Sequence, residues 1–210
     1  ENEPMGGYDP YSSSKGAAEI AINSWRRSFF NPKDYGTKHH VSISSVRAGN
    51  VIGGGDWALD RIIPDCIKAL EANLPIEIRS PRAIRPWQHV LEPLSGYMLL
   101  AQKMWDEPTN YSEGWNFGPR TESITPVWDV AMEVVKEYGS GELKDLSDPN
   151  ALHEAKLLML DISKAKFQLG WEPRMNIHQC IALTIDWYKR YQDMDVYELC
   201  VEQIRKYIRD

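Results

Sequence analysis

Residues 41–73 read VSISSVRAGNVIGGGDWALDRIIPDCIKALEAN. The first part, residues 41–52, is apolar and rich in β-branched side chains, which predicts a buried strand. The glycines at 53–55 end that strand. From residue 60 to residue 73 the apolar side chains recur at helical spacing, with Pro64 in the first turn, so this part predicts a helix.

The same alternation continues on both sides of this stretch. The pattern predicts helices at 10–30, 90–105, 125–138, 163–169, 177–191 and 196–208, and strands at 76–79, 115–118 and 156–160. Residues 139–156 have the composition of a polar loop. Strands that alternate with helices are typical of an α/β fold with parallel pairing.

The composition excludes several classes of protein. Of the 210 residues, 42% are hydrophobic and 26% are charged, which is ordinary for a globular chain, and the net charge of -6 argues against a nucleic-acid-binding surface. No window is apolar enough to span a membrane, and the start, ENEPMGG, resembles neither a signal nor a transit peptide, so we expect a cytoplasmic protein without a membrane partner. Cys66, Cys180 and Cys200 lie far apart, which predicts reduced thiols and no metal site.

Tyr11 and Lys15 lie four residues apart on the first predicted helix, and therefore on the same face. An ammonium group at this position favours the deprotonated form of the phenol, so the tyrosine can take a proton from a hydroxyl group. The lysine can also bind the ribose hydroxyls of a nicotinamide cofactor. The spacing alone is weak, because about 0.6 such pairs are expected by chance in a chain with these numbers of Tyr and Lys. A solvated surface pair is the alternative.

Four longer segments surround these residues: PMGGYDPYSSSKGAAE (4–19), VRAGNVIGGGDWALDRIIPD (46–65), AIRPWQHVLEPLSGY (83–97) and LDISKAKFQLGWEPR (160–174). Together they resemble the extended short-chain dehydrogenase/reductase family of nucleotide-sugar enzymes, and within it the branch that acts on CDP-glucose. The resemblance implies the C-terminal portion of an NAD(P)-binding Rossmann-type fold with a smaller α/β substrate-binding domain.

The family's layout predicts the domains. Residues 1–52, with 88–118 returning to them, correspond to the C-terminal part of the dinucleotide-binding domain, and residues 53–87 and 119–210 correspond to the substrate domain. The family's glycine-rich G-x-x-G-x-x-G turn and its Thr-Asp-Lys type segment do not occur in this sequence. We therefore expect the chain to match only the C-terminal part of such an enzyme, and by itself to be inactive.

The resemblance implies a lyase that uses NAD. A tyrosinate removes the proton of the sugar 4-hydroxyl while NAD takes the hydride from C4; water is then eliminated across C5 and C6, and the hydride returns to C6. CDP-glucose would become CDP-4-keto-6-deoxyglucose, a precursor of deoxysugars in bacterial O-antigen and lipopolysaccharide. The family motif assigns Tyr11 as the base and Tyr11, Lys15 and Arg47 as cofactor contacts.

The resemblance also suggests which residues bind the substrate. Asn50 matches the asparagine of the family's R-x-G-N-V segment, and its alternative is a turn residue before the glycines. A nucleoside diphosphate requires guanidinium groups that match phosphate geometry. Arg61 in LDRIIP and Arg85 in IRPW match the family's basic residues, and Arg79 lies close by in sequence. Without the motif, solvated arginines would be the simpler interpretation.

Other side chains have more than one interpretation. The family's second diphosphate arginine is missing, and His153 or Lys156 stands near its position. The tryptophans on apolar helix faces predict core positions, namely Trp25, Trp105, Trp128 and Trp187. Trp57 and Trp87 flank the ligand segments and could form a wall of the binding site.

Two other functions remain open at this stage. One is another extended-family enzyme, either an epimerase or a dTDP-sugar dehydratase. The other is a non-catalytic chain that binds a nucleotide or a protein. Members of the family often pair through a bundle that includes the Tyr-Lys helix, which implies a homodimer or homotetramer.

Overall fold

The computed structural model describes residues 5–7, 9–148 and 158–209. The chain divides into two compact units. The first unit consists of residues 1–47, 95–117 and 161–172, and the second unit consists of residues 48–94, 118–160 and 173–210.

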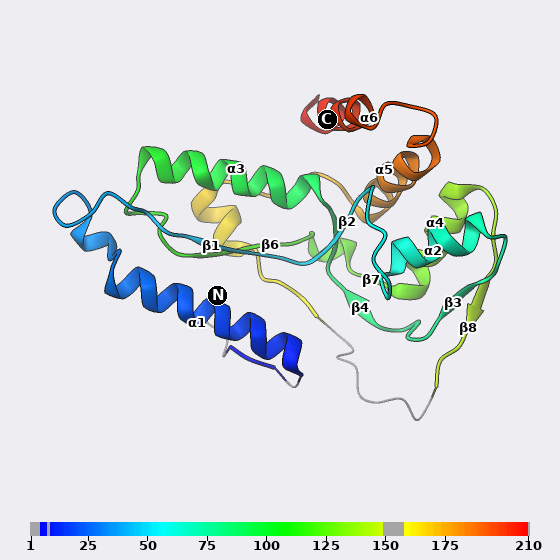
Figure 1. The fold of residues 1–210 in the computed structure, drawn as a ribbon, viewed down its shortest axis with the longest axis horizontal. Helices are drawn as coiled ribbons and strands as arrows, with labels where there is room; N and C mark the ends of the chain where they lie inside the picture. Colours follow the sequence, from blue (N-terminus) through cyan, green and yellow to red (C-terminus); the bar gives the residue numbers. More distant parts are fainter. Residues whose placement is uncertain (1–4, 8, 149–157, 210) are drawn as a thin grey trace. The chain divides into compact units, whose positions relative to one another are not determined.

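Helix α1 (Pro10–Ser28) opens the first unit (Figure 1). It begins at Asp9 because the carboxylate of Asp9 accepts hydrogen bonds from the backbone N–H of Ser12 at 3.0 Å and from its hydroxyl at 2.7 Å. Pro10 has no N–H to leave unsatisfied at the first helical position. These local signals confirm the predicted start of the helix.

The core of the first unit lies around strand β6 (Gly114–Phe117), which pairs with β1 (Ser45–Ala48). Helix α3 (Leu91–Asp106) and a π-helical turn, η3 (Ala165–Leu169), contribute side chains to it. The buried residues are Leu100, Trp115, Phe117, Ala165, Leu169 and Trp171. Gly96 allows α3 to approach closely, because a Cβ there would lie 2.3 Å from the ring of Phe117.

Two parallel ladders form the sheet structure of the second unit. Strand β2 (Asn50–Ile52) pairs with β5 (Trp87–His89), and β3 (Ile76–Ile78) pairs with β8 (Leu143–Asp145). Both pairs are parallel, as the alternation of strands and helices predicts. A short antiparallel pair joins β4 (Ile84–Arg85) to β7 (Thr125–Pro126).

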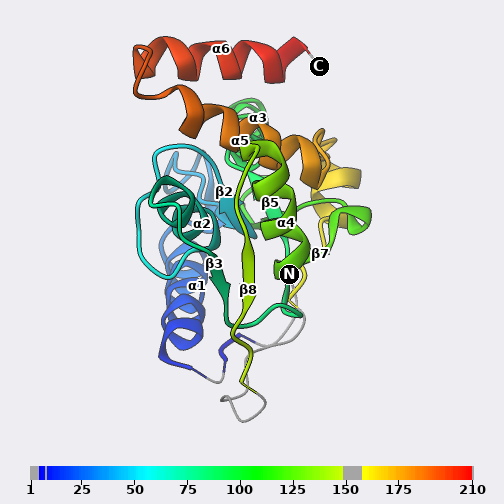
Figure 2. The same cartoon turned by 90° about the vertical axis from the view of Figure 1, so that its right-hand side faces the viewer.

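Four helices belong to the second unit: α2 (Ile62–Glu71), α4 (Val127–Tyr138), α5 (Ile177–Arg190) and α6 (Val196–Arg209). Figure 2 shows α4 beside α5, with β3 and β8 next to each other. One continuous core joins α2, α4 and α5 to the ladders, and its fully buried side chains include Ile63, Ile67, Ile76, Val130, Ile181 and Ile185. Short 3-10 turns lie at Pro32–Asp34 and Thr121–Ser123.

The single strand predicted at 41–52 is not continuous in the structure. The chain breaks it at Gly49, where a Cβ would lie only 2.4 Å from the carbonyl oxygen of Pro86. Residues 41–44 are held instead by a loop of the same unit, because the Ser42 hydroxyl donates to the carbonyl of Pro108 at 2.6 Å. Two short strands, β1 and β2, therefore replace one long strand.

Three other predictions differ from the structure. Residues 143–145 form strand β8 within the stretch expected to be a loop, because they gain a partner in β3. Thr125 does not cap α4 but belongs to β7, and Pro126 is the residue before the helix. The strand predicted at 156–160 lies partly outside the described residues, and residues 158–160, which are described, form no strand.

The limits of the compact units also differ from the predicted domains. Residues 48–52 and 88–94 belong to the second unit, and 161–172 to the first. The physical reason for the last difference is packing, since the ring of Trp171 lies 4.9 Å from that of Phe117 in the first core. Which unit binds a cofactor and which binds a substrate stays a prediction.

Candidate active site

Tyr11 and Lys15 lie on the same face of α1. The Lys15 Nζ atom is 5.6 Å from the centre of the Tyr11 ring, within the range of a cation–π contact. Both side chains are exposed, and the Tyr11 side chain has 72% of its surface accessible. The pair has the arrangement that its spacing predicts, with the phenol open to a reacting molecule.

Gly16, the residue after Lys15, is buried against the segment that precedes the helix. A Cβ at this position would lie 2.9 Å from the backbone nitrogen of Gly6. A small residue is therefore required here, because the backbone of residues 5–7 lies against α1. This close approach packs residues 5–7 against α1, the helix that carries the Tyr-Lys pair.

Arg47 is held inside the first unit. Its guanidinium donates to the Glu19 carboxylate at 2.7 Å and to the Asn116 side-chain oxygen at 3.3 Å. The hydrogen bond from Arg47 holds the pKa of Glu19 below its usual range. The structure thus gives Arg47 a positioning role between α1 and β1, and its contact with a cofactor stays a prediction.

Asn50 is the first residue of β2, opposite Trp87 of β5. Its backbone N–H donates to the carbonyl of Pro86 at 2.9 Å. The alternative of a turn residue is therefore wrong, since Asn50 lies in a ladder and the glycine turn follows it. A role of Asn50 in substrate binding stays a prediction.

The three candidate arginines occupy different places in the second unit. Arg61 precedes α2 and donates to Asp56 at 2.8 Å, while Arg79 donates to Asp60 at 2.6 Å. Both arginine side chains are exposed, and ion pairs of this kind contribute little to stability, so a phosphate-binding role for them stays a prediction. Arg85 lies in β4 opposite Thr125 and is partly buried.

The tryptophans are distributed differently from the prediction. Trp187 is buried in the second core, as predicted, and Trp128 packs against that core from its edge. Trp25 and Trp105 are not core residues, because 57% and 87% of their surfaces are accessible. Apolar helix faces predict burial only when another element covers them, and no described element covers these two.

The two tryptophans predicted to form a wall of the site both have structural neighbours. Trp87 is buried in the second core. Trp57 lies edge-on to Tyr188 of α5, with ring centres 5.2 Å apart. His153 and Lys156 lie outside the described residues.

His89 follows the arginine cluster in sequence and has no role assigned from the sequence, and Glu92 was not singled out. Burial lowers the pKa of His89 to about 4, and among the described residues its Nε2 has no hydrogen-bond partner. Burial raises the pKa of Glu92, whose carboxylate accepts from the backbone N–H groups of Arg174 and Met175 and from the Tyr207 hydroxyl. Both groups are structural rather than exposed to a ligand.

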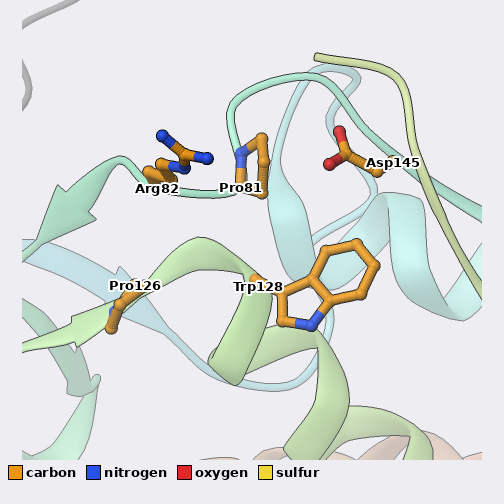
Figure 3. Close-up of a pocket in the computed structure, with 5 residues that line it drawn as sticks. All are labelled: Pro81, Arg82, Pro126, Trp128 and Asp145. Atoms are coloured by element: carbon orange, nitrogen blue, oxygen red, sulfur yellow. The ribbon is translucent and has the colours of Figure 1, made fainter.

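A hollow of about 340 Å³ lies in the second unit and was not expected from the sequence (Figure 3). Its lining residues are Pro81, Arg82, Pro126, Trp128 and Asp145. They come from the β3–β4 connection, from β7, from the first turn of α4 and from the end of β8. The sequence contains no local pattern that would predict this hollow, because its residues come from separate elements and strand β8 was itself not predicted.

Two other kinds of feature were sought in the described ranges. Within residues 5–7, 9–148 and 158–209, no helix is long and apolar enough to cross a membrane. The same residues contain no group of three or more His, Cys, Asp or Glu side chains that could hold a metal ion.

Comparisons with known proteins agree with the resemblance found in the sequence. The family model described as GDP-mannose 4,6 dehydratase matches residues 1–184. The chain is 52% identical over 191 residues to CDP-glucose 4,6-dehydratase of Salmonella typhimurium, covering 91% of this chain and 53% of that protein. It is 26% identical to dTDP-glucose 4,6-dehydratase of Streptomyces antibioticus, covering 90% and 51%.

Solved structures show the same fold. The crystal structure of dTDP-glucose 4,6-dehydratase from Bacillus anthracis in complex with NAD matches with a TM-score of 0.73 at 18% identity, covering 92% of this chain and 56% of that one. This likeness confirms the predicted fold class. The chain spans about half the length of the curated relatives it matches.

Proposed function

The chain belongs to the GDP-mannose 4,6 dehydratase family, and from this premise we propose that the protein is a lyase that removes water from CDP-glucose with NAD as its cofactor. The observation that carries the proposal is the exposed Tyr11 hydroxyl with the Lys15 ammonium beside its ring. The likeness to the Salmonella typhimurium enzyme, at 52% identity, supports the choice of substrate.

The residues on α1 fit one end of the cofactor. Tyr11 and Lys15 present a hydroxyl and an ammonium group on one exposed helix face, which suits a nicotinamide ring and its ribose hydroxyls. NAD, when bound, would supply a temporary store for the hydride, which is taken from C4 and returned to C6 after water is lost, so the cofactor ends in its starting oxidation state. The sequence has no glycine-rich turn for the pyrophosphate. We therefore assign to this chain only the contacts with the nicotinamide ring and its ribose.

The chain's own residues would handle the protons and the substrate. Tyr11, as phenolate, would take the proton of the sugar 4-hydroxyl, and Lys15 would stabilise that phenolate by its charge. A carbonyl group at C4 makes the C5 proton acidic, which permits loss of the 6-hydroxyl as water. Arg85, with Arg61 and Arg79, would neutralise the diphosphate, and Asn50 would orient the sugar.

Two features support a cytoplasmic protein that forms oligomers. The three cysteines are all free, as expected in a reducing compartment. In the first unit, Trp25 of α1, Phe29 just after α1 and Trp105 of α3 expose large apolar surfaces, which favours pairing of copies into a homodimer or homotetramer.

The test is the turnover of CDP-glucose with NAD by the protein that carries this chain, followed by mass spectrometry. We expect a product lighter by one water. Tyr11→Phe should lower the turnover number by about 10²–10⁴-fold, because the ring remains but the proton acceptor is lost.

A matched control is Tyr197→Phe on α6, since Tyr197 has 71% of its surface accessible and lies in the other unit. It should leave turnover unchanged. Wild-type turnover in Tyr11→Phe would remove Tyr11 from the mechanism. A product of unchanged mass with inverted C4 would identify an epimerase instead.

A further inference from the structure

Residues 53–61 connect β2 to α2 and lie against α5 in the second unit (Figure 1). The connection consists of turns and irregular backbone, and it ends at Arg61, one of the candidate phosphate-binding residues. A segment without a ladder or a helix of its own is held in place by side chains from other elements. The contacts that α5 makes with this connection therefore bear on the position of Arg61.

The hydroxyl group of Tyr188, on α5, binds both backbone polar groups of Asp56. It donates to the Asp56 carbonyl at 2.6 Å and accepts from the Asp56 N–H at 3.2 Å. Tyr188 is buried, and burial raises its pKa to about 12, so at neutral pH the hydroxyl keeps the proton that it donates. The two hydrogen bonds join the middle of the connection to α5.

Aromatic packing holds the same connection. The ring of Trp57 lies 5.2 Å from the ring of Tyr188 and 5.6 Å from that of Tyr191, measured between ring centres. Gly54 lies so close to Trp187 that a Cβ at this position would overlap the indole ring. The rings fix the general course of the connection, and the Tyr188 hydroxyl adds the directional contacts at Asp56.

The Asp56 carboxylate connects this fixed backbone to Arg61. It accepts from the Arg61 guanidinium at 2.8 Å and from the Ala58 N–H at 3.0 Å. Burial raises the pKa of Asp56, but the hydrogen bonds from Ala58 and Arg61 outweigh this effect and hold the pKa below its usual range. A guanidinium has five N–H donors, so Arg61 can bind the charged Asp56 and still donate to a phosphate.

We propose that Tyr188 is a positioning residue for substrate binding and that it acts through Asp56 on Arg61. The proposal rests on the proposed function, which supplies the diphosphate. The Tyr188 hydroxyl fixes the backbone of Asp56, and the Asp56 carboxylate holds the Arg61 guanidinium in the orientation that meets the diphosphate. A guanidinium that is already ordered loses less conformational freedom when it binds, so this arrangement increases affinity.

The test is a double-mutant cycle on the binding of CDP, measured by calorimetry with the protein that carries this chain. Tyr188→Phe keeps the ring but removes both hydrogen bonds to Asp56, and it should weaken CDP binding by about three- to tenfold. Arg61→Ala removes the phosphate contact itself and should weaken binding by at least about tenfold. When Arg61→Ala is already present, Tyr188→Phe should change the affinity by less than about twofold, because the group that Tyr188 positions is gone.

Tyr191→Phe is the matched control. The ring of Tyr191 stacks on Trp187 in the same aromatic group, but its hydroxyl accepts from the Gln192 side chain at 2.8 Å. This variant should keep the wild-type affinity for CDP. Turnover of CDP-glucose gives a second readout: Tyr188→Phe should raise KM and leave kcat unchanged, whereas a loss of folded protein would lower the apparent kcat at an unchanged KM.

The outcomes separate the positioning role from the proposed function. Wild-type affinity in Tyr188→Phe, an equal loss of affinity with and without Arg61, or no CDP binding by the wild type would overturn the positioning role. CDP binding that depends on Tyr188 only when Arg61 is present, without loss of water from CDP-glucose, would support the positioning role and contradict the lyase. Loss of water from CDP-glucose with a wild-type KM in Tyr188→Phe would support the lyase and contradict the positioning role.

Discussion

His89 links the stability of the second unit to pH. Its side chain is 2% accessible, its Nδ1 accepts from the Leu91 N–H at 3.3 Å, and burial lowers its pKa to about 4. In the unfolded chain the pKa of a histidine is near 6.5. Between these two values the unfolded state binds a proton that the folded state does not, so the free energy of unfolding falls as the pH falls.

We expect this loss to reach roughly 3 kcal/mol between pH 7 and pH 4. His89→Asn keeps an acceptor for the Leu91 N–H but does not titrate, so its stability should change less over this range. Urea unfolding followed by tryptophan fluorescence at several pH values measures the difference. His40→Gln, at an exposed histidine, is the control and should keep the wild-type slope. An equal slope in His89→Asn would contradict the assignment.

Residue positions were predictable where the reason is local. The shared face of Tyr11 and Lys15 follows from helix geometry alone. The exposure of Trp105 does not follow from local geometry, and neither does the position of Arg82 and Asp145 on the lining of one hollow. Both depend on which distant elements pack together. Burial is a property of the neighbours as much as of the side chain.

Helix α5 shows how the caps define an element. The Asn176 side chain accepts from the Gln179 N–H at 3.0 Å, and the Gln179 side chain accepts from the Asn176 N–H at 2.9 Å. This reciprocal capping box satisfies two backbone donors that the helix would otherwise leave free. Since α5 contributes many side chains to the second core, its first turn matters for the whole unit.

Asn176→Ala should therefore lower the free energy of unfolding by about 1 kcal/mol. Chemical denaturation of the second unit is the measurement. Gln192→Ala, beyond the other end of α5, removes an exposed side chain that donates to the neighbouring Tyr191 hydroxyl at 2.8 Å, and should change stability little. A loss of the same size in both variants would show that the cap has no special role.

Helices were predicted more accurately than strands, because the residues that end a helix lie within or next to it in sequence. The ends of α1 and α4 carry their own signals, Asp9 at one start and the left-handed Gly139 at one end. Strand β8 has no such signal, and its three residues are ordered by hydrogen bonds to β3, about 65 residues earlier in the chain. Pairing over such a separation cannot be inferred from a local pattern.

At the scale of the whole molecule, the described residues form two cores that share no residue. The first contains Phe117, fully buried beside Trp171, and the second contains Val130, fully buried in α4. Each core is built from segments that are distant in sequence. The fold class was predictable from the alternation of elements. The segment 95–117 of the first unit lies within the predicted 88–118, but the inclusion of residues 161–172 was not predicted.

Phe117→Ala should destabilise the first unit by about 3–5 kcal/mol, because it leaves a cavity in a small core. Hydrogen exchange followed by mass spectrometry should then show faster exchange in residues 95–117 and 161–172. Val130→Ala is the reciprocal variant and should accelerate exchange in the second unit. Equal acceleration in both units by either variant would mean that the two cores unfold together.

The carboxylate of Glu92 has a consequence for any shortening of the protein. The Tyr207 hydroxyl reaches it at 2.9 Å from the last turns of α6, and the Arg174 guanidinium donates to the backbone carbonyl of the same tyrosine at 3.3 Å. Trimming α6 would take away a donor to a group that lies out of water. Helix α6 therefore keeps a buried carboxyl group supplied with a hydrogen-bond donor, and any shortened variant has to retain this helix.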